Sequence, residues 1–154
     1  MTGAGEEFLL CRIGSRIGAL IVNDVREVMR PLPIEPLAGA PPFVLGLSIV
    51  RGFPIPVIDA GRLFGPIGLA SPARFISLRL GERTASLAVD AVLDVRSLAP
   101  GAIADIPPLL GEAAIASAIG ALDSKLLLVL EAARLVPESV WHSIGRPSSS
   151  GAFE

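Results

Sequence analysis

Few residues in this sequence could do chemistry on a substrate. His142 is the only histidine and Cys11 the only cysteine. His142 has no cysteine and no acid cluster beside it, so we expect a surface side chain. Cys11 alternates within an apolar strand pattern, where a free cysteine is commonly a small core residue. A metal site needs three or four converging ligands, and the fifteen acidic residues are scattered along the chain.

Phosphate binding and serine chemistry also lack their parts. The glycine-containing stretches GAGEE and GPIGLAS have neither the lysine nor the following helix of a phosphate-binding loop. The serines of GRPSSSG have no base beside them, and the paired acids Glu6 and Glu7 fall at a start that we expect to be disordered. We therefore predict no catalytic residue, no metal and no cofactor, and a protein that is not an enzyme.

Arg51 is the side chain that needs an explanation, because it interrupts the apolar run SIVRGFPIPVIDAGRLF, residues 48–64. Together with Gly52 it forms a tight turn, for which the glycine supplies the backbone freedom. Pro54 and Pro56 then mark an edge strand, since both lack an N–H on the same side. An arginine held there offers a planar fork of five donors to a partner's carboxylate or carbonyl groups. The alternative is an ordinary surface arginine on a hairpin.

Composition narrows the class of protein. The chain has 154 residues and a net charge of -2, with no basic run that could neutralise phosphates, which argues against a nucleic-acid binder. Charged residues make up 18%, below the usual ~25%, which leaves an apolar excess that a docking surface would explain. No stretch reaches the ~18 apolar residues of a membrane helix. With a single cysteine and no signal-peptide pattern, we expect a cytoplasmic protein.

A repeat organises the chain. FLLCRIGSRIGALIVNDVREV (8–28) matches FISLRLGERTASLAVDAVLDV (75–95) at a constant offset of 67. Each copy predicts a strand, a glycine turn, a second strand, one helical turn and a third strand. We expect Asn23 and Asp90 to cap the two helical turns with their side chains.

A second, looser repeat follows the first. PVIDAGRLF (56–64) matches LVLEAARLV (128–136) at an offset of 72, after turns at Arg51-Gly52 and Asp123-Ser124. Each half therefore predicts about five short strands and a short helix, which is typical of a small barrel. The fold class expected is all-β, with two barrels that either are contiguous in the chain or exchange strands.

The remaining segments connect or flank these repeats. Five prolines in residues 30–42 exclude helix and central strand and predict an extended crossing. Residues 98–114 predict a second, looser crossing, and LVPESVWHSI a short helix whose Trp141 packs on a barrel. We expect one domain, residues 7–144, made of repeats at about 8–65 and 75–137, and a flexible tail, 145–154.

The chain resembles the CheW family of bacterial chemotaxis coupling proteins. The resemblance rests on FLLCRIGSRIGALIVNDVREVM, PLAGAPPFVLGLSIVRGFPIPVIDAGRLFG, RFISLRLGERTASLAVDAVLDVRSL and ALDSKLLLVLEAARLV, and it runs from about residue 7 to 136. It implies two packed five-stranded Src-homology-3-like barrels and a non-enzymatic adaptor. Such an adaptor joins a chemoreceptor's cytoplasmic tip to the regulatory domain of a CheA-type histidine kinase. Related contacts build rings and arrays at membrane receptors.

The sequence departs from the family pattern at the turn. The family commonly has asparagine-leucine-arginine-glycine where this chain has Ile49-Val50-Arg51-Gly52, and the usual leucine after the acid is Ala60. A divergent scaffold of a non-chemotactic receptor–kinase pathway is therefore an alternative. A small-ligand-binding double-barrel sensor and a regulatory domain of a larger kinase are two others.

The resemblance also suggests which residues bind partners, and each has a plainer alternative. The candidates are Arg51, Val25, Glu27, Val28, Gly52 and Asp59. The valines are by default core residues, or else line a groove between the barrels that accepts a receptor helix. Glu27 is expected to face solvent or a partner. For Asp59 we favour capping of the AGRLF helical turn over a partner contact.

Overall fold

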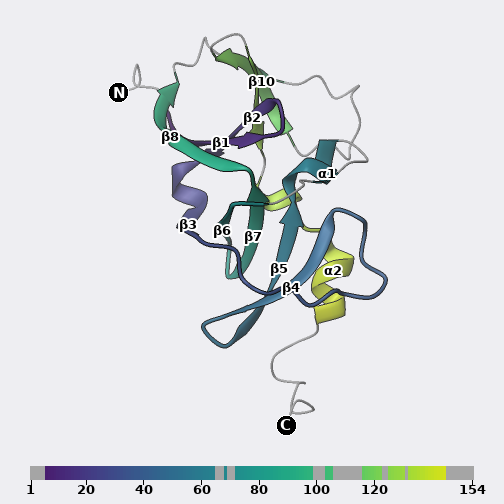
Figure 1. Cartoon of the computed structure of the whole chain (residues 1–154). Helices are drawn as coiled ribbons and strands as arrows, with labels where there is room; N and C mark the ends of the chain where they lie inside the picture. The colour runs from purple at the N-terminus through teal and green to yellow at the C-terminus, as the bar shows by residue number, and fades with distance from the viewer. Residues whose placement is uncertain are drawn as a thin grey trace.

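The computed structural model consists mostly of strands, arranged in two sheets (Figure 1). It describes residues 6–64, 68, 72–98, 103–105, 116–122, 125–130 and 132–144. Sheet A has the strand order β8 (Ala91–Leu98), β1 (Glu6–Ile13), β2 (Arg16–Ile21), β11 (Lys125–Leu130), β10 (Ala116–Leu122) and β9 (Ile103–Asp105). Sheet B has the order β3 (Val25–Met29), β6 (Arg74–Leu80), β7 (Arg83–Val89), β5 (Phe53–Asp59) and β4 (Val44–Val50).

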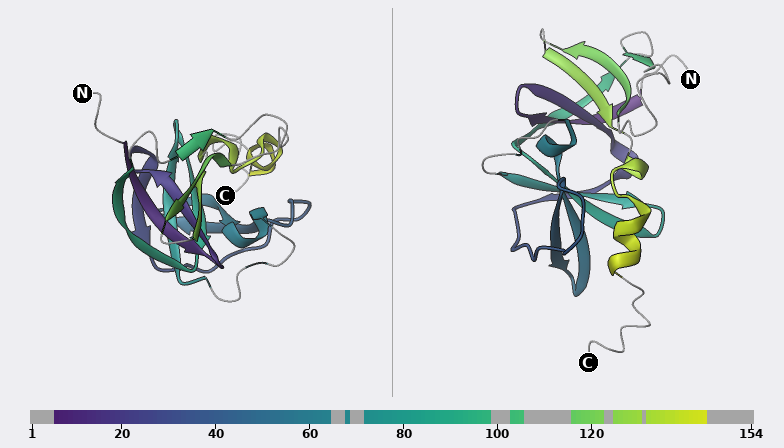
Figure 2. Two further views of the ribbon diagram at one scale, coloured as in Figure 1. Left: turned by 90° about the horizontal axis from the view of Figure 1, so that it is seen from above. Right: turned by 90° about the vertical axis from the view of Figure 1, so that its right-hand side faces the viewer.

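Short helical segments connect or cover the sheets. They are η1 (Val22–Asp24), α1 (Ala60–Phe64), η4 (Ala132–Arg134) and α2 (Glu138–Ile144). Two further views show the sheets stacked one above the other, with α2 beside sheet B (Figure 2). We call the two units barrel A and barrel B after their sheets. The expected double barrel is confirmed, except that sheet A has a sixth strand, the three-residue β9.

The two halves of the chain exchange strands. The third and fifth strands of each repeat pair with the first and second strands of the other repeat, so both barrels contain strands from both halves. The register obeys the same symmetry. Equivalent pairs are Val28↔Ile76 and Val95↔Leu9 for the third strand, and Val57↔Ser86 and Val129↔Ala19 for the fifth. The 67-residue repeat is therefore a true structural repeat, and neither barrel is contiguous.

Strand alternation divides the apolar residues among three cores. One face of each sheet fills its own barrel, around Phe8 in barrel A and around Phe75 in barrel B. The opposite faces meet in a larger core between the barrels, which contains Leu20, Leu87 and Cys11. Burial raises the pKa of the Cys11 thiol to about 12, so it remains a protonated core residue, as expected from the sequence.

Several local expectations are confirmed. Residues 30–43 form no helix or strand apart from one bridge, Glu35↔Leu47. At Pro54 and Pro56, β5 pairs with β4, and its pairing with β7 begins only at Val57, so this part of β5 is an edge. In addition, α2 forms where LVPESVWHSI predicted a helix.

Three expectations about local structure are wrong. Asn23 lies inside η1, which begins after Ile21 without a side-chain cap. Asp90 caps no helical turn, because the chain bends there directly into β8. Its Oδ2 instead accepts a hydrogen bond of 2.6 Å from the N–H of Gly14, in the turn of the other repeat.

The third correction concerns the start of the first repeat. Glu6 and Glu7 are not disordered but open β1, where they pair with β8. The crossing at 98–114 contains β9. The turn at Asp123-Ser124 and the tail 145–154 lie outside the described residues, and the bounds of the domain stay a prediction. Within the described residues, no helix is long and apolar enough to cross a membrane.

Candidate partner-binding site

The turn between β4 and β5 is built from two residues with positive φ. Arg51 has φ 51° and Gly52 has φ 86°, between the paired residues Val50 and Phe53. Positive φ at both central residues is the tight hairpin turn that matches strand twist. The sequence suggested that Gly52 alone would take up the positive φ of the turn. The structure shows that two residues do so. Arg51 also has a positive φ, a backbone conformation that residues other than glycine, asparagine and aspartate seldom adopt.

Arg51 and Glu27, predicted independently as partner-binding residues, contact each other. The Arg51 Nη1 donates to Glu27 Oε2 at 2.7 Å and Nη2 donates to Oε1 at 3.1 Å. The guanidinium favours the ionised form of the Glu27 carboxyl and lowers its pKa, mainly through the hydrogen bond. The Arg51 side chain nevertheless stays 65% exposed, against 33% for Glu27. The fork is thus fixed in one direction while much of it faces solvent.

This ion pair also spans the open side of barrel B. Glu27 belongs to β3 and Arg51 follows β4, and these two strands are the opposite ends of sheet B. No ladder joins β3 to β4 in the part of the chain that the structure describes. The bidentate pair therefore links the two sheet edges that backbone hydrogen bonds leave apart.

The candidate valines separate into two classes. Val25 is half-buried and packs against the core between the barrels. Val28 is 41% exposed, and its repeat mate Val95 is 52% exposed. Both exposed valines lie on end strands, β3 of sheet B and β8 of sheet A, at symmetry-equivalent positions. Val28 and Val95, rather than Val25, are therefore available to an apolar partner surface.

Asp59 is buried, and its geometry fits the capping role that we favoured. Its Oδ1 accepts hydrogen bonds from the N–H groups of Gly61 at 2.8 Å and Arg62 at 3.3 Å, at the start of α1. It differs in role from the Arg51 turn, because it ends β5 and its Oδ1 accepts from the backbone of the following element, α1. Its proposed contact with a partner stays untested.

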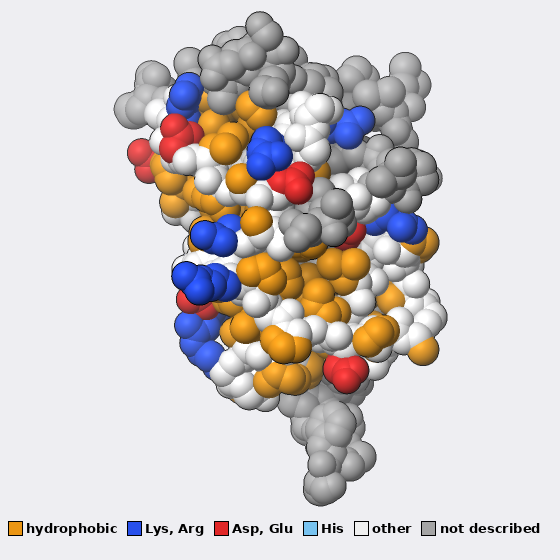
Figure 3. Space-filling view, in the orientation of Figure 1, with side chains coloured by type: hydrophobic (Ala, Val, Ile, Leu, Met, Phe, Trp, Pro, Cys, Tyr) orange, Lys and Arg blue, Asp and Glu red, His pale blue; other side chains and the backbone are white. Residues whose placement is uncertain are grey.

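Two large apolar side chains beside Arg51 were not singled out from the sequence. Ile49 and Phe53 are among the most exposed large hydrophobic residues of the described chain. The signal was present, because Ile49 stands where the resembling family has an amide, at a hairpin tip. Figure 3 shows apolar side chains spread over this face of barrel B, in agreement with the apolar excess of the composition.

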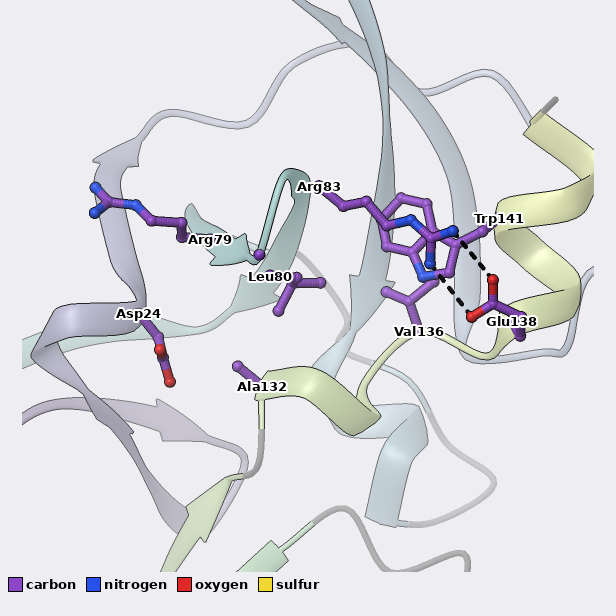
Figure 4. Close-up of a pocket in the computed structure, with 9 residues that line it drawn as sticks. Asp24, Arg79, Leu80, Arg83, Ala132, Val136, Glu138 and Trp141 are labelled. Carbon is purple, nitrogen blue, oxygen red and sulfur yellow. Dashed lines mark hydrogen bonds and ion pairs between the residues drawn. The ribbon is translucent and has the colours of Figure 1, made fainter. Parts of the chain in front are cut away.

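The short helix α2 is fastened to barrel B by Arg83 of β7. The guanidinium of Arg83 lies 4.8 Å from the centroid of the Trp141 ring. It also donates to both carboxylate oxygens of Glu138, at 3.3 and 3.1 Å (Figure 4). A cleft of about 440 Å³ lies beside this contact, bordered by Asp24 and Ala132. His142 is exposed on the same helix, as predicted.

The described residues offer no set of three or more histidine, cysteine or acidic side chains that could hold a metal ion. The arrangement instead presents a rigid arginine fork, exposed apolar side chains and sheet ends. Such features suit recognition of another protein, because arginine and aromatic residues dominate binding energy at interfaces.

Comparison with known proteins gives one consistent result. A profile of the CheW-like domain matches residues 7–140. The chain is 25% identical to a chemotaxis protein CheW of Rhizobium meliloti, over 89% of this chain and 91% of the relative. It is 32% identical to protein FrzA of Myxococcus xanthus, over 77% of this chain and 75% of the relative. The crystal structure of the scaffolding protein TtCheW from Thermoanaerobacter tengcongensis superposes with a TM-score of 0.69 at 27% identity, over 82% and 88% of the two chains.

Proposed function

Because the chain belongs to the CheW-like domain family, whose members are non-enzymatic scaffold or adaptor proteins, we propose that it couples chemoreceptors to a CheA-type histidine kinase. In this role it binds the receptor's cytoplasmic tip and the regulatory domain of the kinase, and is recruited to receptor arrays at the membrane through them. Contacts between copies of such adaptors extend the assembly into rings. The exposed, preorganised fork of Arg51 is the observation that carries the proposal.

The geometry of Arg51 favours a contact with a partner. Its backbone is fixed by the turn and its guanidinium by Glu27, so binding costs little further side-chain order. Its neighbours Ile49 and Phe53, which strand alternation places on opposite faces of the hairpin, each leave apolar surface exposed beside it. An arginine within an apolar surround is the usual composition of the small set of residues that dominate an interface.

The test replaces Arg51 by glycine, alanine and lysine. Glycine accepts φ 51° without a Cβ, so Arg51→Gly removes the side chain and preserves the turn. Arg51→Gly and Arg51→Ala should each bind the kinase or the receptor about thirtyfold more weakly. Arg51→Lys should recover only part of the affinity, since an ammonium cannot replace the planar fork. The measurements are affinities and kinase activation in a reconstituted receptor complex.

A thermal melt separates binding from folding in these variants. Arg51→Gly should melt no lower than Arg51→Ala, because only the alanine keeps a Cβ at positive φ. Arg74→Ala, at an exposed arginine that opens β6, is the matched control. If a well-folded Arg51→Gly protein activates the kinase as the parent does, Arg51 is no coupling residue.

The departure at the turn supports a second candidate. Ile49 stands where the CheW family commonly has an asparagine, and its apolar side chain is exposed. The same adaptor chemistry would then serve a receptor–kinase pair outside chemotaxis. Pull-downs with chemotaxis and non-chemotaxis kinases from the same cell distinguish the two.

A further inference from the structure

The duplication provides an internal comparison between the two barrel interiors. Six equivalent positions point inward in each barrel. In barrel A they are all apolar and form one buried cluster: Phe8, Leu10, Ile17, Ala19, Leu127 and Val129. At the same offsets of 67 and 72, barrel B has Phe75, Ser77, Thr84, Ser86, Ile55 and Val57. Three apolar side chains of the barrel A interior are therefore replaced by hydroxyl residues in barrel B. The pairs are Leu10 and Ser77, Ile17 and Thr84, and Ala19 and Ser86.

A cavity lies where barrel B has hydroxyl residues in place of the apolar side chains of barrel A. A groove of about 800 Å³ opens at the end of barrel B where the hydroxyl residues lie. We call it the barrel B groove; its lining includes Ser77, Thr84, Ile55, Phe53 and Trp141. This volume falls within the usual ~300–1,000 Å³ of small-molecule sites, and barrel mouths are common places for them.

Ser86 adds a polar group that lacks a partner. It is 1% exposed, and among the described residues its Oγ has no hydrogen-bond partner. Alternation along β7 puts it on the same side as Thr84, and it lies directly opposite Ser77 of β6. Both neighbours line the barrel B groove; Ser86 does not itself border the groove but lies buried next to them. Buried hydroxyls are normally satisfied, which makes this one a candidate contact for a molecule in the groove.

Among the described residues, Arg26 offers the mouth of the groove a guanidinium that no carboxylate engages in an ion pair. Arg51 is paired with Glu27 and Arg83 with Glu138, while Glu82 also lines the groove. Arg26 donates to Thr84 Oγ1 at 3.4 Å and forms no ion pair with a carboxylate in the described part of the chain. A guanidinium can only donate.

We propose that the barrel B groove binds a small amphipathic carboxylate. The carboxylate accepts hydrogen bonds from Arg26 and from the hydroxyl groups of Ser77 and Thr84, with the unpaired hydroxyl of Ser86 buried next to them. The apolar body of the ligand lies against the walls formed by Phe53 and Trp141. This site does not rest on the proposed coupling role, because it is defined by the interior of barrel B, although its mouth includes Arg51 and Phe53 of the candidate partner-binding surface.

Phenylacetate is a suitable probe, with phenylacetamide as its neutral counterpart. Trp141 is the only tryptophan and the chain has no tyrosine, so the fluorescence reports on the surroundings of Trp141, which borders both the barrel B groove and the cleft beside Asp24 and Ala132. A ligand of this size should bind with a Kd of about 1 mM or tighter. In NMR titrations the amides of Ser77, Thr84 and Ser86 should shift to saturation, while the equivalent amides of barrel A stay in place. Phenylacetamide should bind about tenfold more weakly.

Two variants test the chemistry of the site. Ser77→Leu restores the side chain that Leu10 supplies to barrel A, and it should abolish binding by filling the groove. Arg26→Gln changes an exposed side chain, so folding is preserved; it should weaken phenylacetate about tenfold and leave phenylacetamide unchanged. Arg12→Gln, an exposed arginine on β1, is the control and should bind as the parent does.

The proposal is overturned if phenylacetate fails to saturate, shifts both barrels alike, or binds no better than phenylacetamide. It is equally overturned if folded Arg26→Gln keeps the parent affinity for phenylacetate. If Ser77→Leu does not fold, the Arg26→Gln result decides.

Discussion

The contact between Arg51 and Glu27 has two structural effects. The bidentate pair directs the arginine fork and also links the end strands of sheet B. Exposed ion pairs contribute little to stability because water screens them. The contact therefore matters more for where the guanidinium points than for how firmly the domain is folded.

The pair makes a prediction about pH. Arg51 lowers the pKa of Glu27 from its ordinary value of 4.5. A carboxylate whose pKa is lowered by folding contributes stability above its unfolded pKa, and this contribution is lost as pH falls through the folded pKa. The difference in Tm between the parent and Glu27→Gln should therefore be largest above about pH 5 and shrink on acidification.

Arg51→Gln serves as the control for that measurement, because it removes the main cause of the lowered pKa of Glu27. In its background Glu27→Gln should change Tm by a smaller amount at neutral pH. Equal effects in both backgrounds would show that Glu27 and Arg51 are not coupled.

At the scale of elements, the exposed valines on β3 and β8 are the better test of receptor binding. Val28→Lys adds a charge to an exposed apolar position, so it should melt close to the parent yet bind the receptor at least about tenfold more weakly, with kinase binding less affected. Val25→Lys would force a charge toward the core between the barrels and should lower Tm. Circular dichroism melts and receptor and kinase pull-downs of both variants make the measurement. Receptor binding by Val28→Lys equal to the parent's would exclude this valine from the interface.

Most elements could be predicted because they depend on local pattern. The strands, the glycine turns and the helix around Trp141 follow from alternation and turn residues. The strand exchange could not be predicted, since either pairing buries the same apolar faces. The positive φ of Arg51 was hidden because arginine has no preference for that region. The three hydroxyl residues of barrel B could have been found by comparing alternate positions of the two repeats.

At the scale of the whole molecule, the strand exchange makes the two halves interdependent. A chain divided at residue 68 should give fragments that are each unfolded alone, because each lacks strands of both barrels. Mixed together, they should form a 1:1 complex with the circular dichroism spectrum of the intact chain. Size-exclusion chromatography and circular dichroism measure this outcome. A fragment that folds cooperatively by itself would contradict the interdependence.

The exchange also sets an order of events on the ribosome. Barrel B has all its strands once β7 has emerged, at residue 89. The apolar faces of β1 and β2 are made first, yet their partners β8 and β11 emerge only at residues 91–98 and 125–130. During synthesis β1 and β2 therefore keep apolar surface exposed until β8 and β11 emerge. Such transiently exposed surface is what chaperones bind.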